Sequence, residues 1–390
     1  FVYQARITDE FIHSTKEHEK SKFISMALQC GIVGLPNVGK STLFNALTAS
    51  KALSANYPFA TKDPNVGIIT VPDDRLQQLA ELIHPQRVLP TTVEIVDIAG
   101  LIKGASQGEG LGNQFLANIR EVNAILHVVR CFENDNVIHV DGKVDPVQDK
   151  EIIDTELLLK DIETVTKRVE RLKKNAKSGE KEALRQLENG QHILAQLEEG
   201  QPARTLVLTK DQKELLDEMM LLTAKPVLYV CNVDENSVVT GNELTRKFEA
   251  AVADENAGII LISAEIESEI IQLSDPDERM MFLEEMGLNE PGVNRLIRSS
   301  YELLQLITYF TAGEKEVRAW TVLKGTKAPQ AAGVIHTDFE EGFIRAEVIS
   351  FDDFIKYGSE AAVKEAGKMA VEGKDYVVQD GDIMHFRFNV

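Results

Sequence analysis

The stretch from Gly34 to Ser41, GLPNVGKS, constrains the fold of this chain more than any other feature. It matches the pattern G-x-x-x-x-G-K-[ST], in which glycines permit a tight turn whose backbone N–H groups surround an anion. The apolar run 27–33 before it predicts a strand, and residues 41–48 after it predict a helix whose N-terminus favours negative charge. A strand, this loop and a helix in that order predict a phosphate-binding unit in an α/β fold.

Several residues of this loop have a predicted chemical role. Lys40 supplies a cation to the β- and γ-phosphates of a nucleotide, so it is also the first candidate for a catalytic residue. The Ser41 hydroxyl is a predicted Mg²⁺ ligand. The residues of the loop that we expect to bind nucleotide are Asn37, Val38, Gly39, Lys40, Ser41 and Thr42.

Two later segments fit the sensing loops of a nucleotide switch. Thr61 lies in an irregular loop about 20 residues beyond the P-loop, where its hydroxyl could reach the metal. Asp97 closes a β-branched strand and begins the sequence DIAG, so we expect it to hold Mg²⁺ through water, while the Gly100 N–H senses the γ-phosphate. The glycine-rich residues 100–112 suit a segment that nucleotide orders.

A third motif concerns the base. Asn232-Val-Asp-Glu235 stands where nucleotide switches of this architecture carry N-K-x-D, with Val233 at the lysine position and Glu235 at the aspartate position. A longer carboxylate cannot pair with guanine N1 and N2 without moving the base, so the departure weakens guanine selectivity and favours ATP. Ser263 and Ala264, from the triplet SAE, match the last base-contacting loop.

Composition limits the remaining function classes. No apolar run approaches the roughly 20 residues that a membrane helix needs, so we expect no membrane partner. The net charge of −20 argues against general adhesion to nucleic acid, although it leaves room for a local basic face. Cys30, Cys131 and Cys231 lie in or beside predicted buried strands, as expected of reduced core residues in a cytoplasmic protein.

Strands that alternate with helices predict a parallel α/β sheet with its ligands at the carboxyl ends of the strands. A helical pattern interrupts it, with a coiled-coil seam over 158–172, a turn at 175–180 and basic residues near the tip that fit either a solvated face or a ribonucleoprotein contact. We predict an extension without chemistry at 1–25, a nucleotide-binding domain at 26–145 and 225–305, a helical hairpin at 146–224 and a small α+β domain at 306–390. In that last domain, residues 376–386 read as a β-hairpin turning at Asp380-Gly381.

These motifs in this order, from Met26 to Val390, resemble the YchF family of Obg-type P-loop NTPases. The resemblance implies a G-domain-like, mostly parallel sheet with an inserted coiled-coil hairpin and a C-terminal TGS-like β-grasp domain. It also implies an Mg²⁺-dependent ATPase that releases ADP and phosphate. Such a protein associates with the ribosome, through the large subunit, in translation or stress responses. The basic residues of the hairpin and of the C-terminal domain would also fit contacts with RNA, with an ordinary solvated surface as the alternative.

The residue after DIAG is Leu101, whereas Ras-like switches place a water-orienting glutamine there. Leucine cannot align water, so we expect slow intrinsic hydrolysis unless another group acts. His139 is one candidate catalytic group, because a neutral imidazole can accept a hydrogen bond from water; a solvated loop histidine is the simpler interpretation. A K⁺ ion or the ribosome could supply the missing element instead.

Three other functions stay open. An Obg-type GTPase differs only in the preferred purine. A small-molecule kinase also uses a P-loop, but the DxxG segment and the base motif do not suit one, and phosphate release without an acceptor would separate the two. A nucleotide-independent ribosome or RNA adaptor predicts ribosome binding that is indifferent to nucleotide.

Overall fold

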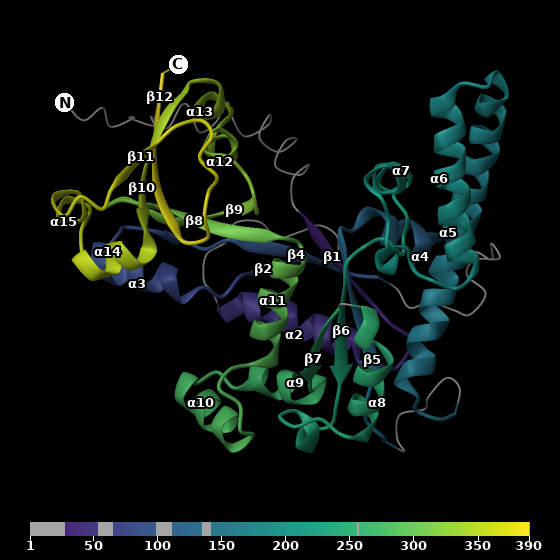
Figure 1. Ribbon diagram of the computed structural model, residues 1–390. Helices are drawn as coiled ribbons and strands as arrows, with labels where there is room; N and C mark the ends of the chain where they lie inside the picture. The colour runs from purple at the N-terminus through teal and green to yellow at the C-terminus, as the bar shows by residue number, and fades with distance from the viewer. Residues whose placement is uncertain (1–27, 54–64, 99–110, 135–141, 256, 390) are drawn as a thin grey trace.

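Two six-stranded sheets organise the computed structural model, which describes residues 28–53, 65–98, 111–134, 142–255 and 257–389 (Figure 1). The strand orders are β2-β4-β1-β5-β6-β7 and β11-β10-β12-β8-β9-β3. Among the helices in these ranges, none combines the length and the apolar character that crossing a bilayer requires.

The first sheet is parallel except for β2, which pairs antiparallel with β4. Every residue of β5 and β6 is buried, as expected of central strands covered on both faces. Its strands are β1 (Gln29–Val33), β2 (Val66–Thr70), β4 (Thr92–Asp97), β5 (Ala124–Arg130), β6 (Val227–Asn232) and β7 (Gly258–Ile262). Its helical elements are α2 (Lys40–Leu53), α4 (Leu111–Glu121), η4 (Glu235–Ser237), α8 (Glu243–Ala251), η5 (Ala253–Glu255), α9 (Ala264–Gln272), α10 (Pro276–Glu285) and α11 (Gly292–Leu303). This arrangement confirms the predicted α/β nucleotide-binding fold.

The helical insertion forms an arm with a core of its own. The arm consists of α5 (Pro146–Asn175), η2 (Ala176–Ser178), α6 (Lys181–Glu198), η3 (Ala203–Thr205) and α7 (Lys210–Met219). Its antiparallel pair α5–α6 is the predicted hairpin, and the seam residues Val165, Val169 and Leu172 are buried. The third helix, α7, was not predicted. It begins with a capping box of Thr209 and Gln212 and buries Leu215 and Leu216 in the same core.

A buried ionic network joins the arm to the first sheet. Lys150 Nζ of α5 lies 2.7 Å from Asp154 and 2.5 Å from Glu255 of η5. Arg204 of η3 lies 2.9 Å from Glu255, whose carboxylate also accepts a 2.7 Å hydrogen bond from the Tyr229 hydroxyl of β6. The four charged side chains are only 8–15% exposed, so each needs its ion-pair partners to compensate for the hydration that it loses on burial.

The second sheet forms the C-terminal domain. Its strands are β3 (Val88–Leu89), β8 (Leu306–Ala312), β9 (Val317–Leu323), β10 (Phe343–Ser350), β11 (Ala370–Glu372) and β12 (Asp382–Phe388). Its helices are α12 (Ala328–Ile335), α13 (Thr337–Glu341), α14 (Phe351–Tyr357) and α15 (Glu360–Glu365), while α3 (Asp74–Ile83) packs onto it from the first half of the chain. Figure 1 shows this domain, in yellow and light green, and the arm, in teal, as two separate projections.

The predicted hairpin over 376–386 is wrong. The chain does turn at Asp380 and Gly381, but only β12 follows as a strand, and it lies between β10 and β8. Both edges of β12 are therefore occupied. The Asp382 carboxylate accepts hydrogen bonds from the Tyr376 hydroxyl (2.7 Å) and the Gln379 N–H (2.8 Å), which tie the preceding segment to the start of β12.

Candidate functional site

The loop between β1 and α2 is wound as an anion-binding turn. Asn37 (φ 63°) and Gly39 (φ 98°) lie on the left-handed side of backbone space, a conformation that turns successive N–H groups toward one concave side. A side chain at Gly39 would place its Cβ 2.3 Å from Asn232 Nδ2. The final glycine is therefore required both for its backbone angle and for the close approach of Asn232.

Lys40 lies inside this loop. Its side chain is 8% exposed, and Nζ donates a 2.8 Å hydrogen bond back to the Leu35 carbonyl. Burial lowers the pKa of Lys40 to about 8, while the negative charge of Asp97 acts in the opposite direction. An ammonium with so little water around it is poised to exchange its carbonyl contact for a phosphate oxygen.

Asp97 and Ser41 offer hard oxygen ligands beside that ammonium. Asp97 ends β4 and is level with Ile32 of the parallel neighbour β1, so it lies at the strand edge from which the P-loop begins. Burial raises the pKa of Asp97, and Lys40 opposes this shift. Ser41 is exposed on the first turn of α2. A carboxylate and a hydroxyl suit Mg²⁺, which binds proteins through a few such oxygens and keeps several waters.

Three predicted site residues, Thr61, Gly100 and His139, lie outside the described residues, as does Leu101. The metal and catalytic roles that the sequence suggests for them stay predictions.

On the base side, Asn232 is a clamp between two loops. Its Nδ2 donates to the Val38 carbonyl (2.9 Å), and its Oδ1 accepts from the Ala264 N–H (3.0 Å). It is 4% exposed, and Ser263 caps α9 next to it by accepting a 3.4 Å hydrogen bond from the Ile266 N–H. The structure thus brings the P-loop, the Asn232 motif and the Ser263–Ala264 loop together, as the motif order predicts.

The two departures from the usual base motif differ in their surroundings. Val233 is 2% exposed and belongs to the hydrophobic core, and its N–H donates to the Ile262 carbonyl (2.9 Å). Glu235 is exposed and begins the short helix η4. The carboxylate is therefore free to meet a ligand, whereas a lysine at position 233 would have to leave the core.

Sequence patterns could not identify two groups of this site, the Leu35 and Val38 carbonyls. Each accepts a hydrogen bond from a motif side chain. Every residue carries such a carbonyl, so no residue type distinguishes these two.

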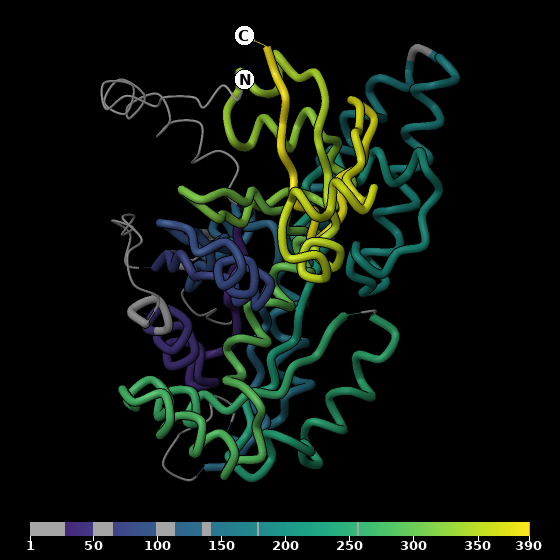
Figure 2. The backbone as a smooth tube through the Cα atoms, turned by 90° about the vertical axis from the view of Figure 1, so that its left-hand side faces the viewer, coloured from purple at the N-terminus to yellow at the C-terminus, as the bar shows by residue number. Residues whose placement is uncertain are grey.

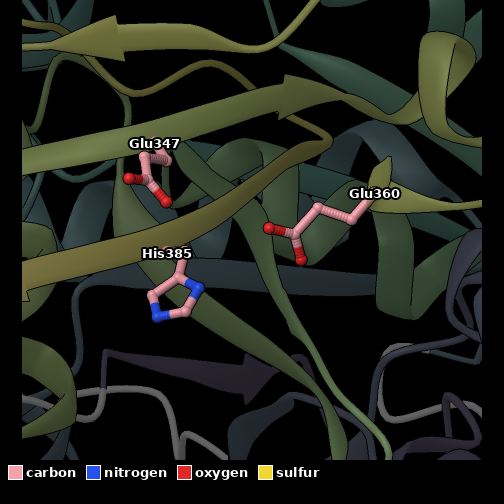
Figure 3. Close-up of side chains that lie close together, drawn as sticks. All are labelled: Glu347, Glu360 and His385. Atoms are coloured by element: carbon pink, nitrogen blue, oxygen red, sulfur yellow. The ribbon is translucent and has the colours of Figure 1, made fainter. Parts of the chain in front are cut away.

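A second polar cluster lies far along the chain, where Glu347 of β10, His385 of β12 and Glu360 of α15 place ligand atoms within 4.8 Å of one another (Figure 3). The Glu347 carboxylate forms an ion pair with Arg387 at 2.9 Å, and the Arg345 guanidinium lies 3.9 Å from the same carboxylate. Two guanidinium groups compensate its charge, so the cluster needs no cation and we assign none.

Comparisons with known proteins agree with this site. A family model described as a 50S ribosome-binding GTPase matches residues 29–233, and the model of the YchF-GTPase C-terminal domain, described as a protein of unknown function, matches 306–389. The "Ribosome-binding ATPase YchF" of Bacillus subtilis is 57% identical over 94% of this chain and 100% of its own length; that of Escherichia coli O157:H7 is 56% identical with the same coverage. The solved structure of the Schizosaccharomyces pombe YchF GTPase is 40% identical, covers 92% of this chain and 97% of its own, and has a TM-score of 0.83.

Proposed function

The chain belongs to the YchF family of P-loop NTPases, and from this premise we propose that it is an Mg²⁺-dependent ATPase that associates with the ribosome. The observation that carries the proposal is the buried Lys40 ammonium, enclosed by the P-loop and next to Asp97. Such a group, in a loop of converging N–H groups, stabilises a phosphate chain and the charge that develops on a transferred phosphoryl group.

Different residues would contact the phosphates and the metal of a bound triphosphate. The P-loop N–H groups and Lys40 hold the β- and γ-phosphates, and Gly100 senses the γ-phosphate. Ser41 and Thr61 would ligate Mg²⁺ directly, and Asp97 would hold one of its waters. When bound, the metal neutralises charge on the β- and γ-oxygens.

Base choice is the point on which the relatives' names differ, since the bacterial relatives are called ATPases and the yeast structure a GTPase. Asn232 would hold the base from the position set by Val38 and Ala264, because its amide keeps a second N–H and a lone pair for a ligand. The exposed Glu235 does not reproduce the aspartate that pairs with guanine, which supports ATP as the substrate.

Restoring the guanine-reading carboxylate should shift this preference. Glu235→Asp is expected to raise GTP affinity relative to ATP by about tenfold, since a charge-assisted hydrogen bond contributes about 1.5–3 kcal/mol. Adding Val233→Lys restores the full motif and should extend the shift, although the buried site must open to admit the lysine. Competition titration with both nucleotides measures the ratio, and Glu243→Asp, on the exposed first turn of α8, is the matched control. A ratio unchanged in both motif variants would contradict this account of base choice.

The water-activating group remains a proposal. With Leu101 at the glutamine position, we expect slow hydrolysis, with His139, K⁺ or the ribosome as the candidates for the missing element. Hydrolysis measured with Na⁺ against K⁺, and with and without ribosomes, separates these candidates, and His139→Ala tests the histidine.

Association with the ribosome, through the large subunit, rests on the relatives' names and on the description of the matching 50S-binding family. The exposed lysines at the tip of the arm, Lys173, Lys174 and Lys177, are candidates for contact with RNA. Co-sedimentation with ribosomes in ATP, ADP or no nucleotide is the test. If the chain binds ribosomes equally well in all three conditions and releases no phosphate from ATP, the adaptor function is favoured instead.

A further inference from the structure

A helix and a strand inserted between β2 and β4 build part of the C-terminal domain. β2 and β4 are paired from Val66↔Val96 to Thr70↔Thr92, and the Val71 N–H then donates to the Thr91 carbonyl (3.0 Å). A turn of two residues could close such a hairpin. The chain instead inserts residues 72–90, here called the connecting segment, which contains α3 and β3.

The connecting segment covers one face of the C-terminal sheet. Tyr309 and Phe310 of β8 point to opposite faces because side chains alternate along a strand, and they belong to different hydrophobic clusters. The cluster around Phe310 includes Leu76 and Leu79 of α3, which are 6% and 0% exposed. Both views show α3, in blue, beside the C-terminal strands (Figures 1 and 2). Without α3, this face would expose apolar surface to water.

Backbone and ionic contacts fasten the connecting segment to this sheet. β3 pairs in parallel with β9, and the Val317 N–H donates to the Arg87 carbonyl while the Gln86 N–H donates to the Glu314 carbonyl, both at 3.0 Å. Arg75 Nη1 lies 2.7 Å from Asp380, whose carboxylate also accepts a 2.8 Å hydrogen bond from the Thr308 N–H.

The opposite end of the same hairpin lies at the phosphate site. Asp97 ends β4, its N–H donates to the Asn65 carbonyl (2.8 Å), and it is level with Ile32 at the entrance of the P-loop. Five paired positions, about 17 Å of strand, separate this end from the connecting segment. The two strands and α3 thus form one hydrogen-bonded and packed unit between Asp97 and the C-terminal sheet.

We propose that this unit couples the nucleotide state to the position of the C-terminal domain, which therefore acts as an effector within the same chain. The inference rests on the proposed nucleotide-dependent function. A change in the strand pair at Asp97 is carried to Thr70 and Thr91 by the ladder of backbone hydrogen bonds, and α3 and β3 carry it into the second core. If nucleotide changes the affinity of the C-terminal domain for a partner by some factor, then by thermodynamic linkage the bound partner changes the affinity for nucleotide by the same factor.

Hydrogen exchange on the full chain, with saturating ADP or a non-hydrolysable ATP analogue in Mg²⁺, tests the coupling. The amides of Gln86 and Val317, which donate to the Glu314 and Arg87 carbonyls and so join the connecting segment to the C-terminal domain, are expected to differ in exchange rate between the two nucleotides by about fivefold or more. The Ala331 amide, bonded to the Lys327 carbonyl within the same domain, should exchange equally in both states and serves as the internal control.

A variant of the contact gives a second readout. Arg75→Ala removes the ion pair to Asp380, and we expect it to change the ratio of the Kd values for ADP and the ATP analogue about fivefold. Lys327→Ala removes the 2.7 Å ion pair to Asp375 inside the C-terminal domain and should leave the ratio unchanged. Suppose that both nucleotides bind, that exchange at Gln86 and Val317 is the same in both states, and that Arg75→Ala leaves the ratio of Kd values unchanged. The coupling is then wrong, while the proposed nucleotide-binding function stands. If neither nucleotide binds, the proposed function fails and the coupling with it.

Discussion

Lys40→Ala is expected to weaken ATP binding about 30- to 150-fold. The substitution removes an ammonium that is 8% exposed and partnered by one carbonyl, so the triphosphate loses a charge-assisted contact of about 2–3 kcal/mol in a site with little water. Isothermal titration calorimetry measures the affinity. The fold should survive, because the hydrogen bond of the Lys40 side chain is to the Leu35 carbonyl of its own loop.

The control for this prediction is Lys210→Ala. Lys210 begins α7, its side chain is 88% exposed, and it lies 3.8 Å from Glu214 in a surface ion pair. The Lys210→Ala substitution removes one positive charge, as Lys40→Ala does, so any effect of net charge on ATP binding appears in both variants. An ATP affinity for Lys40→Ala within about threefold of the control would remove the basis of the phosphate-binding assignment.

Arg204→Ala is expected to lower the free energy of unfolding by about 3–5 kcal/mol, because it leaves the buried carboxylates of Asp154 and Glu255 with too few cations. The guanidinium contacts three groups, the Asp154 and Glu255 carboxylates and the Tyr229 hydroxyl. A loss of this size is a large part of the roughly 5–15 kcal/mol that stabilises a typical domain. Chemical denaturation followed by far-UV circular dichroism reports on the helical arm and the sheet together.

Arg185→Ala provides the comparison. Arg185 lies on the same arm, pairs with Glu182 and Asp211, and its side chain is 53% exposed, so we expect a much smaller loss than for Arg204→Ala, because water screens an exposed ion pair. Equal losses in the two arginine variants would show that the network between α5, η3, η5 and β6 does not fasten the arm to the sheet.

The phosphate loop, the strands and the helical hairpin could all be predicted because their signals are local. GLPNVGKS needs its glycines for backbone geometry, near-continuous apolar runs indicate buried parallel strands, and spacings of three and four residues indicate the α5–α6 seam. The order of the motifs along the chain also placed Asp97 and Asn232 at one edge of the sheet, since parallel strands end on the same side.

Other features depend on residues far apart in the chain. The sequence of α3 predicts an amphipathic helix, but it does not say whether the apolar face packs on the nucleotide domain or on the C-terminal sheet. A helix that covers either surface needs the same kind of apolar face. The pairing of Arg204 with Asp154 and Glu255 joins charges from three elements, each of which would pass for a solvated residue on its own helix.

The amino-acid sequence by itself determined which chemistry this protein carries, because a phosphate-binding loop and its companion motifs are written in residue types and short spacings. Only the tertiary structure decided how Lys40 and Asn232 are held, and that the link between β2 and β4 belongs to the C-terminal sheet. The Lys40 and Asn232 contacts use main-chain carbonyls, which every residue carries, and the link to the C-terminal sheet depends on packing between distant segments. No local sequence pattern specifies either.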